Sequence, residues 1–442
     1  ILNPVALQEL IPDYLEKGCP IETTIQGDAF YYLTRRHAIP IPFIPRYLHN
    51  KGYHVVSLAK LNPWMGAIAE DMGVNIFPGF AGKKLILDDK NARVLGVQTG
   101  EKGLDISGKP KSTFEPAMDL LAKVTVFGEG ARGSLVKELD SIMGISTNSM
   151  PQAYETGIKE VIALPDTSGF ETIKGRSLHM LGHPLGMGTP GGGFVYEMKD
   201  KRVALGYLVG LSYEEPMMDI YDTFMQFKRH PFVAALIQGG KVIEQGARTV
   251  STGGYFSMPK LVVDGGVLVG GCAGIHNVPA LKGIHVSMKS GMLAAGAILE
   301  ALMEGDISGD RLAHYPDAIE KSWLKNELYE GRNFYQALSK KGVSKFFHLG
   351  AQYVTGGRGF RDRMPLEDDC RALKPVNDSG PGMGGSKDDA AYDGVLLVDK
   401  LTGVYLSKTI HREDQPPHLI IHDMDLCVNV CFPRYRHPCT RF

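Results

Sequence analysis

The fold of this chain is decided by the stretch Gly265-Gly266-Val267-Leu268-Val269-Gly270-Gly271-Cys272-Ala273-Gly274-Ile275-His276-Asn277-Val278-Pro279. The apolar residues 261–269 predict a strand, the glycines of 270–274 predict a tight turn, and a long apolar helix is expected to begin at about Gly283. A helix N-terminus presents free N–H groups and a positive dipole end, which suits an anionic or electron-rich ligand. Small residues at 294–297 let the helix lie close to a sheet, and packing alone is the alternative explanation for them.

A second stretch follows the same order of strand, glycine-rich turn and helix. Residues 124–127 are apolar, Gly128-Glu129-Gly130-Ala131-Arg132-Gly133 forms the turn, and Ser134 is a suitable N-cap for a helix through Leu139. The spacing fits the G-x-G-x-x-G dinucleotide fingerprint, but residues 141–165 show no strand that ends in the expected acidic residue. The turn is therefore more consistent with a later loop that contacts a flavin or its pyrophosphate. An opening Rossmann loop and a turn without a ligand remain the alternatives.

The rest of the chain divides into segments of different character. Residues 150–250 alternate apolar and polar residues in short runs, which predicts antiparallel sheet, interrupted by an amphipathic helix over 222–238. After Ser322 the pattern is helical to about Tyr353. Beyond it, a Gly-, Pro- and Asp-rich stretch is expected to be a linker, and the last 49 residues, from 394 onward, are too few for a complete domain.

Composition excludes several classes of protein. The 442 residues allow two or three domains, and 43% hydrophobic with 22% charged residues is ordinary for a globular protein. A formal net charge of −1 gives no basic footprint, so nucleic acid is not an expected partner. The six cysteines do not suggest a disulfide framework. No apolar run reaches the ~18 residues that span a bilayer, so we expect a chain that can lie on a membrane without crossing it.

Both glycine stretches resemble the electron transfer flavoprotein-ubiquinone oxidoreductase family. The match continues through Lys282-Gly283-Ile284-His285 and Lys289-Ser290-Gly291, extends back to Trp64-Met65-Gly66 and reaches forward to Asp414-Gln415-Pro416. It covers nearly the whole chain. The resemblance implies a fold of the α/β plus α+β class: an FAD-binding domain like that of glutathione reductase, an inserted antiparallel-sheet quinone-binding domain, and a truncated C-terminal iron–sulfur domain of ferredoxin-like type.

The resemblance also implies domain boundaries. In chain order we expect an FAD-binding domain at 1–150 with a membrane-associated hairpin near 28–48, a ubiquinone-binding antiparallel-sheet domain at 151–255, the rest of the FAD domain with a membrane-facing helix at 256–355, a linker at 356–393, and a truncated iron–sulfur domain at 394–442. The first Rossmann segment of the FAD domain is expected to lie before Ile1.

The resemblance assigns residues to two sites. The FAD contacts it implies are Gly128, Glu129, Gly130, Gly133, Gly270, Gly271, Gly274, Asn277 and Gly283. The ribityl contact falls to backbone groups or to Asn277, because this chain lacks the acidic residue that more distant flavoproteins carry near Gly271. Backbone groups of Gly191 and Gly192 are expected to hydrogen-bond the quinone head group, although Pro190 replaces the aromatic residue that the family often has there. Glycine within a strand indicates close approach by a ligand or another backbone, and a bulge is the alternative.

Two segments are expected to face the membrane, because they combine apolar and aromatic residues with nearby cations. The residues concerned are Phe30, Tyr31, Ile41, Phe43 and Ile44 in the first segment and Phe346 and Phe347 in the second. The second segment, at 334–355, matches the family's membrane helix but is more polar, and an ordinary core helix is the alternative there.

Three cysteines near the end of the sequence have metal-like spacing. Cys427, Cys431 and Cys439 form a C-x3-C-x7-C pattern, which by itself is compatible with a cluster or zinc site. The resemblance instead implies that the ligands of the family's 4Fe-4S cluster lie beyond Phe442. We therefore expect no metal ligands within this chain.

The resemblance implies an electron-transferring-flavoprotein dehydrogenase that passes electrons from reduced electron transfer flavoprotein through FAD to ubiquinone, in support of fatty acid β-oxidation and the respiratory chain. The expected partners are electron transfer flavoprotein, ubiquinone and a membrane surface, on the matrix face of the mitochondrial inner membrane or on a bacterial inner membrane. No acid–base or nucleophilic constellation stands out, so no catalytic side chain is assigned and the protein's part is positioning and redox tuning. A related FAD-dependent reductase or monooxygenase and a non-catalytic membrane-associated fragment are the alternatives.

Overall fold

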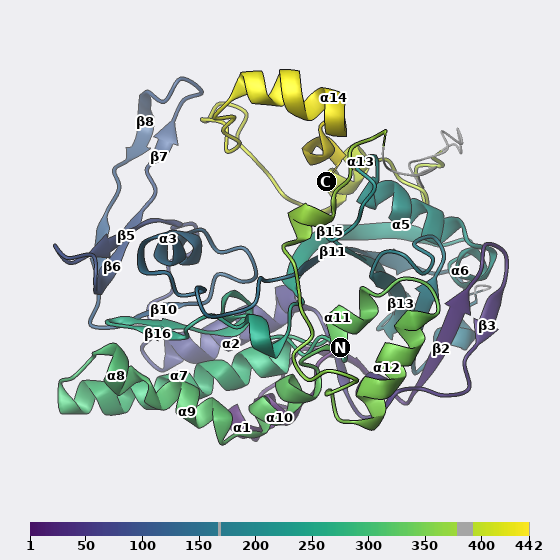
Figure 1. The fold of residues 1–442 in the computed structure, drawn as a ribbon, viewed down its shortest axis with the longest axis horizontal. Coiled ribbons are helices and arrows are strands. Elements are labelled where there is room, and N and C mark those ends of the chain that lie inside the picture. The colour runs from purple at the N-terminus through teal and green to yellow at the C-terminus, as the bar shows by residue number, and fades with distance from the viewer. Residues whose placement is uncertain (167–168, 378–391, 442) are drawn as a thin grey trace.

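The computed structural model describes residues 1–166, 169–377 and 392–441. Two bodies with separate hydrophobic cores lie side by side (Figure 1). One is built on a seven-stranded sheet, and the other on a small sheet packed against the long helix α7 (Ile284–Glu304). Residues 378–391, which fall in the expected linker, lie outside the described residues.

The larger sheet has the strand order β15-β11-β14-β13-β12-β2-β3. Its strands are β2 (Gly27–Leu33), β3 (Ala38–Pro40), β11 (Tyr154–Ala163), β12 (Arg176–Gly182), β13 (Gly191–Met198), β14 (Arg202–Gly210) and β15 (Lys241–Ser251). Strands β11 to β15 pair antiparallel, as predicted. The sheet as a whole is mixed rather than antiparallel, because β2 pairs in parallel with β12 and brings the 28–48 segment into the same sheet.

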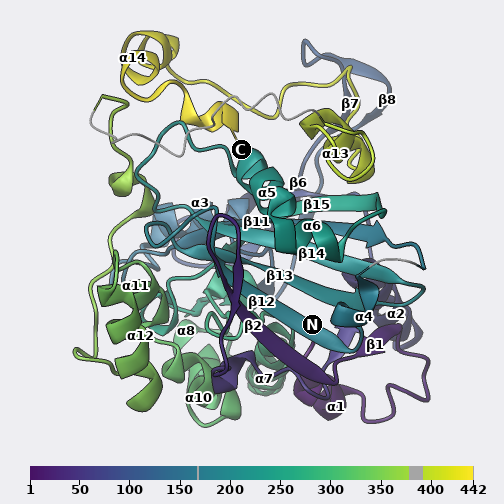
Figure 2. The same cartoon turned by 90° about the vertical axis from the view of Figure 1, so that its right-hand side faces the viewer.

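One face of this sheet is covered by α4 (Phe170–Ile173), α5 (Ile220–Arg229) and α6 (Pro231–Leu236) (Figure 2). The helix predicted over 222–238 is two helices. The first begins after Asp219, whose carboxylate accepts hydrogen bonds from two backbone N–H groups of the first turn. The second begins at Pro231, which suits the first position of a helix because its missing N–H would have no partner there.

The second body contains the predicted strand–turn–helix units. β10 (Thr125–Phe127) pairs in parallel with β17 (Gly266–Leu268), and α3 (Ser134–Met143) and α7 follow the two turns. The strand predicted over 261–269 is broken into β16 (Val262–Val263) and β17. Gly265 turns the chain between them at φ +71°, and a Cβ there would overlap the carbonyl oxygen of Val94, so glycine is required.

Helix α7 begins directly after Gly283, as predicted. Within the part of the chain that the structure describes, it is the one helix long and apolar enough to span a bilayer, by length and composition only. Val286, Ala294, Ala297 and Ala301 on one side of it are buried in the core of the second body. Packing therefore accounts for this side of the helix, whereas Leu299 and Met303 are exposed.

The segment predicted to be helical over 334–355 forms two helices, α11 (Phe334–Leu338) and α12 (Ser344–Val354). The chain turns between them at Gly342, which has φ +60°. Both helices lie beside the β2–β3 end of the larger sheet (Figures 1 and 2), where Phe43 contacts Tyr353 with ring centroids 5.2 Å apart.

The remaining helices and strands complete the two bodies. The helices are α1 (Val5–Leu10), α2 (Leu58–Asp71), α8 (Gly309–Leu312), α9 (His314–Glu320), α10 (Trp323–Glu330), α13 (Lys400–Leu406) and α14 (Phe432–Tyr435). The strands are β1 (Ile21–Thr24), β4 (His54–Val56), β5 (Gly82–Leu87), β6 (Val94–Thr99), β7 (Lys102–Leu104), β8 (Pro110–Glu115) and β9 (Asp119–Leu121). The β7–β8 hairpin projects from the second body, and the C-terminal elements α13 and α14 lie over the larger sheet (Figure 1).

Candidate functional site

The two glycine loops predicted to contact FAD meet in space. Gly271 lies so close to the other loop that a Cβ added to it would be 3.3 Å from the Cα atom of Gly130 and from the backbone nitrogen of Ala131. At Gly130, by contrast, the space where a Cβ would lie is open. Gly270 and Gly274 have φ values of +62° and +71°, which favour glycine. The two turns therefore present a joined surface of backbone with few side chains on it.

Glu129, predicted among the FAD contacts, is engaged within its own turn. Its two carboxylate oxygens accept hydrogen bonds from the backbone N–H groups of Leu135 (3.3 Å) and Val136 (3.0 Å), at the start of α3. A Cβ added to Gly133 would collide with this side chain, at 2.5 Å from a carboxylate oxygen. The side chain thus caps α3, and the backbone of the turn is left for a ligand.

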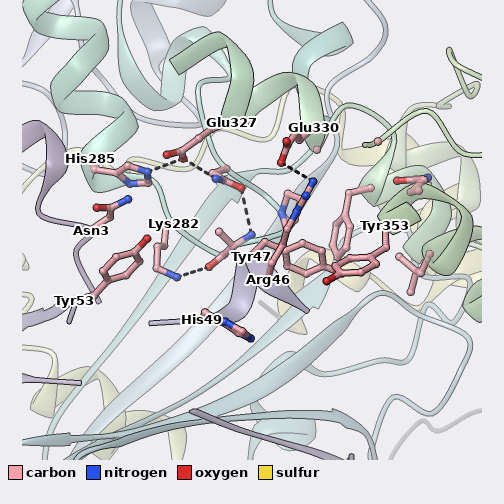
Figure 3. A pocket seen from close by; sticks show the side chains of 18 residues that line it. Asn3, Arg46, Tyr47, His49, Tyr53, Lys282, His285, Glu327, Glu330 and Tyr353 are labelled. Carbon is pink, nitrogen blue, oxygen red and sulfur yellow. Dashed lines mark hydrogen bonds and ion pairs between the residues drawn. The ribbon is translucent and has the colours of Figure 1, made fainter. Parts of the chain in front are cut away.

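The second loop is held by hydrogen bonds that converge on Glu327 of α10 (Figure 3). Glu327 Oε2 accepts a hydrogen bond from Asn277 Nδ2 at 2.8 Å and lies 2.8 Å from His285 Nε2. Asn277 Oδ1 in turn accepts from the backbone N–H of Ala280 at 3.3 Å. Burial acts to raise the pKa of Glu327, but the hydrogen bond and charge of His285, then Asn277 and Lys282, leave it lowered. The side-chain amide of Asn277, which was predicted to contact the ribityl group, is therefore engaged in hydrogen bonds that hold the loop in place.

Lys282 brings a cation into a pocket of about 260 Å³ that Asn277, His285 and Glu327 also line, and we call it the candidate FAD pocket (Figure 3). The glycines predicted to contact FAD do not line this pocket. The residue is 5% exposed, its Nζ donates to the carbonyl oxygen of Ala280 at 3.0 Å, and it lies 5.4 Å from the ring centroid of Tyr53. Burial lowers the pKa of Lys282 to about 8, against the opposing charges of Asp28 and Glu327. The ammonium form therefore predominates at neutral pH.

These features fit the ring end of an FAD. The glycine turns leave room for close approach of a ligand, α7 starts after Gly283 without a side-chain cap on its N–H groups, and Lys282 supplies one positive charge. An electron-rich ring that gains negative charge on reduction suits this donor set.

An apolar cavity of about 330 Å³ lies between the larger sheet and the helices α11 and α12. It is lined by Gly191, Gly192 and Gly193 of β13 and Leu208 of β14. Its other apolar and aromatic walls are formed by Phe30, Tyr32, Ile41, Phe43, Pro45, Tyr47, Leu48, Phe334, Leu338, Phe346, Leu349 and Tyr353. The structure thus brings the two glycines predicted for the quinone together with four of the residues predicted to face the membrane.

Side chains are excluded at all three glycines of β13. A Cβ on Gly192 would lie 2.6 Å from the carbonyl oxygen of Met180, and one on Gly193 would overlap the ring of Phe227. Gly191 has φ +140°, and a Cβ there would overlap the carbonyl oxygen of Leu208. The register with β12 ends at Gly193, so the strand ladder on that side does not extend to the two preceding glycines. Packing of the sheet is sufficient to require glycine, whether or not a ligand binds.

Two titratable side chains that line the cavity were not predicted. His179 Nε2 lies 3.2 Å from Asn50 Nδ2 and 3.3 Å from Ser177 Oγ, and burial, followed by the charge of Lys282, lowers the pKa of His179 to about 3. Glu155 of β11 is 3% exposed, and burial, followed by the charge of Asp369, raises its pKa to about 7. No sequence signal marks these positions as functional, because a polar residue in an alternating strand usually faces solvent.

The residues predicted to face the membrane differ in exposure. Phe43, Phe346 and Phe347 are 55%, 43% and 68% exposed. Phe30, Ile41 and Ile44 are half-buried. Tyr31 packs against Phe232 of α6, with ring centroids 4.7 Å apart, on the other face of the sheet from the cavity.

The three C-terminal cysteines are free thiols, and Cys427 Sγ lies 3.4 Å from His437 Nε2. Over residues 1–166, 169–377 and 392–441, no three His, Cys, Asp or Glu side chains are arranged to hold a metal ion. The described residues therefore supply no ligand set for an iron–sulfur cluster.

Comparison with solved structures identifies the fold as that of FAD-dependent oxidoreductases. A geranylgeranyl bacteriochlorophyll reductase-like protein from Thermoplasma acidophilum matches with a TM-score of 0.56 and 15% identity, over 80% of each chain. The flavin-dependent halogenase CmlS matches with a TM-score of 0.52 and 13% identity, over 84% of this chain and 61% of the halogenase. At these identities the similarity concerns the fold alone.

Sequence comparison is more specific. The family model for the ETF-QO ubiquinone-binding domain matches residues 154–250, and that for the electron transfer flavoprotein-ubiquinone oxidoreductase 4Fe-4S domain matches residues 394–442. The electron transfer flavoprotein-ubiquinone oxidoreductase of Pseudomonas aeruginosa is 38% identical over 451 aligned residues, which cover all of this chain and 80% of the relative. The mitochondrial enzyme of Bos taurus is 37% identical over all of this chain and 72% of the relative. The chain belongs to the electron transfer flavoprotein-ubiquinone oxidoreductase family.

Proposed function

We propose that this protein takes electrons from reduced electron transfer flavoprotein onto FAD and delivers them to ubiquinone, the reaction for which its relatives are named. The family membership and the fold support this activity. The same proposal assigns 1–150 and 256–355 to the FAD-binding domain, 151–255 to the quinone-binding domain and 394–442 to the iron–sulfur domain.

One structural observation carries the proposal: the candidate FAD pocket and the apolar cavity share a wall. Pro279, on the loop after the second glycine turn, lines both spaces. Leu281 lines the apolar cavity, whereas its neighbour Lys282 lines the FAD pocket. A flavin and a quinone bound in the two spaces would be separated by little more than one loop, which favours direct electron transfer between them.

FAD, when bound, would supply the redox chemistry, and the residues of this chain would position it. The backbone of the two glycine turns would hold the cofactor, while Lys282 and the N-terminus of α7 would stabilise negative charge on its ring. The hydrogen bonds to Glu327 would keep the loop that carries Lys282 in place. On the quinone side, Gly191 and Gly192 would offer backbone groups to the head group, and the aromatic walls would exclude water.

We further propose that the mouth of the apolar cavity faces a membrane. Phe43 and Phe346 line the cavity and are also exposed, so they mark its opening. Phe347 projects beside them, and the exposed cations Arg35 and Lys340 lie on the flanking segments. A hydrophobic quinone could then enter from the lipid, at the matrix face of a mitochondrial inner membrane or at a bacterial inner membrane.

The test uses the FAD-bound protein under anaerobic conditions. We expect the visible absorption bands of the flavin to bleach when reduced electron transfer flavoprotein is added and to return when a ubiquinone analogue is added. A protein without flavin bands would contradict the proposal in favour of a non-catalytic fragment. A flavin reduced only by a nicotinamide cofactor and indifferent to ubiquinone would instead indicate a related reductase or monooxygenase.

A further inference from the structure

We propose that Glu155 donates one of the two protons that ubiquinone takes up on reduction, and that Asp369 and Tyr335 connect Glu155 to a second cavity, whose lining includes several charged side chains. This inference rests on the proposed function, because it concerns the same quinone cavity. Without Glu155, the apolar cavity would contain no carboxylic acid that could give a proton to the quinone.

The chemistry sets the requirement. Conversion of a quinone to a quinol adds two electrons and two protons, so the cavity needs a group that can give up a proton near neutral pH. The titratable side chains that line it are Glu155, His179 and three tyrosines, Tyr32, Tyr47 and Tyr353. Burial holds His179 in its neutral form, with a pKa of about 3, and raises the pKa of Tyr47 to about 12. Glu155 is the one carboxylic acid among the lining residues.

The position of Glu155 follows from the strand register. Glu155 of β11 is opposite Gly210 of β14, and the neighbouring Val209 is opposite Gly191 of β13. Two strand spacings of about 4.8 Å each therefore separate the backbone of Glu155 from that of Gly191, a gap that a glutamate side chain and a bound ring can bridge. No described residue donates a hydrogen bond to the Glu155 carboxyl group, although the residue is 3% exposed. A buried acid without a donor favours its protonated form.

Asp369 is near enough for its charge to act on Glu155, and it does not line the apolar cavity. Its Oδ2 accepts a hydrogen bond from the backbone N–H of Tyr154 at 2.8 Å, and its Oδ1 is buried without a hydrogen-bond partner among the described residues. Asp369 is only partly buried as a residue, in contrast to Glu155. A path from Glu155 to Asp369 therefore runs from a buried residue to a partly exposed one.

Tyr335 lies between this pair and a second cavity of about 530 Å³, which is lined by both charged and apolar side chains. Its hydroxyl group is 3.0 Å from Ser212 Oγ, and a Cβ on Gly210, the cross-strand partner of Glu155, would lie 2.9 Å from the same hydroxyl. Tyr335, Ser212 and Asp368, the neighbour of Asp369, all line this cavity, whose rim includes the exposed Lys340. Tyr335 therefore lies between the cavity and the two acids, which do not line it themselves.

The titratable groups that act on Glu155 are Asp369 and Tyr335 of α11, and His179 lines the same cavity. Asp368 and Arg132, on the first glycine loop, act on Asp369, and Arg132 lies 5.0 Å from the ring centroid of Tyr154. Burial, then the charge of Asp369, raises the pKa of Glu155 to about 7. Burial also raises the pKa of Asp369 to about 6, against the hydrogen bond from Tyr154. Both acids can therefore exchange protons near neutral pH.

The transfer breaks the O–H bond of Glu155 and forms an O–H bond on the quinone oxygen that faces it. A bound flavin would supply the electrons and become oxidised. The carboxylate left on Glu155 regains a proton from Asp369 or from water beside Tyr335, and the second proton goes to the other quinone oxygen, at the opposite end of the ring.

The main test is Glu155→Gln in the FAD-bound enzyme. We expect the rate of ubiquinone reduction to fall by about a hundredfold, which is typical for loss of a general acid, while flavin reduction by electron transfer flavoprotein and the KM for ubiquinone stay unchanged. The wild-type rate should decline as pH rises above about 7, and this decline should be lost in the variant. Glu155→Asp should recover part of the rate. Glu171→Gln, which changes an exposed carboxylate on α4, is the matched control.

An infrared measurement tests the same inference without turnover. The pH-difference spectrum of the wild type should contain the carbonyl band of a buried carboxylic acid that titrates near pH 7, and this band should be absent from Glu155→Gln. A variant with the wild-type rate and pH profile, or a band that persists in it, would overturn the inference. If the variant does not fold, Asp369→Asn serves instead, because loss of the Asp369 charge should move the band to lower pH. A wild type that reduces no ubiquinone would count against the proposed function, whereas absence of the band would count against Glu155 alone.

Discussion

Glu327 of α10 and His285 of α7 are joined by a 2.8 Å contact between Oε2 and Nε2, and the same carboxylate oxygen accepts a hydrogen bond from Asn277 at 2.8 Å. One side chain therefore ties two helices and the second glycine loop together beside the candidate FAD pocket (Figure 3). The pKa of Glu327 is lowered overall although burial opposes this, so the group is a charged acceptor at neutral pH.

The first prediction concerns this carboxylate. Glu327→Ala leaves the buried His285 and the half-buried Asn277 without this partner, so we expect the free energy of unfolding to fall by about 1–3 kcal/mol and FAD to dissociate faster. Thermal unfolding and the rate of flavin release measure the two effects. Glu300→Ala on α7 is the control, because the exposed Glu300 contacts only Arg311 and His314, both at 3.3 Å, and does not line the pocket. Equal losses in the two variants would contradict a special role for Glu327.

The second prediction tests the quinone cavity through Gly350 rather than through the glycines of β13. Substitution of Gly192 would push a side chain into the backbone of Met180 and disturb the sheet itself. Gly350 of α12 also lines the cavity, and the space where its Cβ would lie is open. Gly350→Leu should therefore raise the KM for ubiquinone, leave flavin reduction unchanged and stabilise α12 by up to about 1 kcal/mol.

Gly296→Leu is the matched control for Gly350→Leu. It also fills open space on the exposed side of a helix, but it lies on α7 and away from the cavity. Steady-state kinetics with a ubiquinone analogue compare the two variants. An unchanged KM in Gly350→Leu would mean that the quinone binds elsewhere.

The third prediction separates two candidate membrane surfaces. Phe347 of α12 is 68% exposed and does not line the quinone cavity. Phe347→Ser removes one aromatic ring that would be buried in the lipid, so binding to anionic lipid vesicles should weaken by about tenfold while the quinone cavity stays unchanged. Leu299→Ser removes a 60% exposed apolar side chain from α7, the helix long enough to span a bilayer. Cosedimentation at low and high salt measures both. Weaker binding in Leu299→Ser alone would place the membrane surface at α7 instead of α12.

The sequence was sufficient to predict those features that local patterns encode. The strand–turn–helix order around Gly270 and the start of α7 at Gly283 are confirmed, because glycine turns and apolar runs are local signals. The parallel pairing of β2 with β12 was missed, because the local sequence pattern of a strand does not indicate a partner about 150 positions away. Glu327 was missed for the same reason: it contacts Asn277 from 50 positions away.

Glu155 shows a second limit. Its alternation with apolar residues in β11 is compatible with an exposed position, and only the packing of α11 and of the segment around Asp369 makes it buried. The chemistry of such a residue comes from its surroundings, which are assembled from segments more than 150 positions apart.

The last prediction follows from the burial of Glu155 and needs no bound ligand. In the unfolded chain its pKa is near the ordinary value of 4.5, whereas in the folded protein it is about 7. Between these two values the folded protein holds a proton that the unfolded chain has released. Stability should therefore decrease as pH rises from about 4.5 to 7 and stay at its lower value above that range.

Glu155→Gln removes the titrating proton while keeping the shape of the side chain. At pH 8 we expect the variant to be more stable than the wild type by up to about 3 kcal/mol, the free-energy equivalent of the pKa difference, and at pH 4 we expect the two proteins to be nearly equal. Asp369, whose pKa is also raised, should leave a weaker pH dependence of the same sign in the variant. Denaturant unfolding at several pH values measures this. A variant that is less stable than the wild type at pH 8 would mean that Glu155 is ionised and paired in the folded protein, which would also remove it as a proton donor.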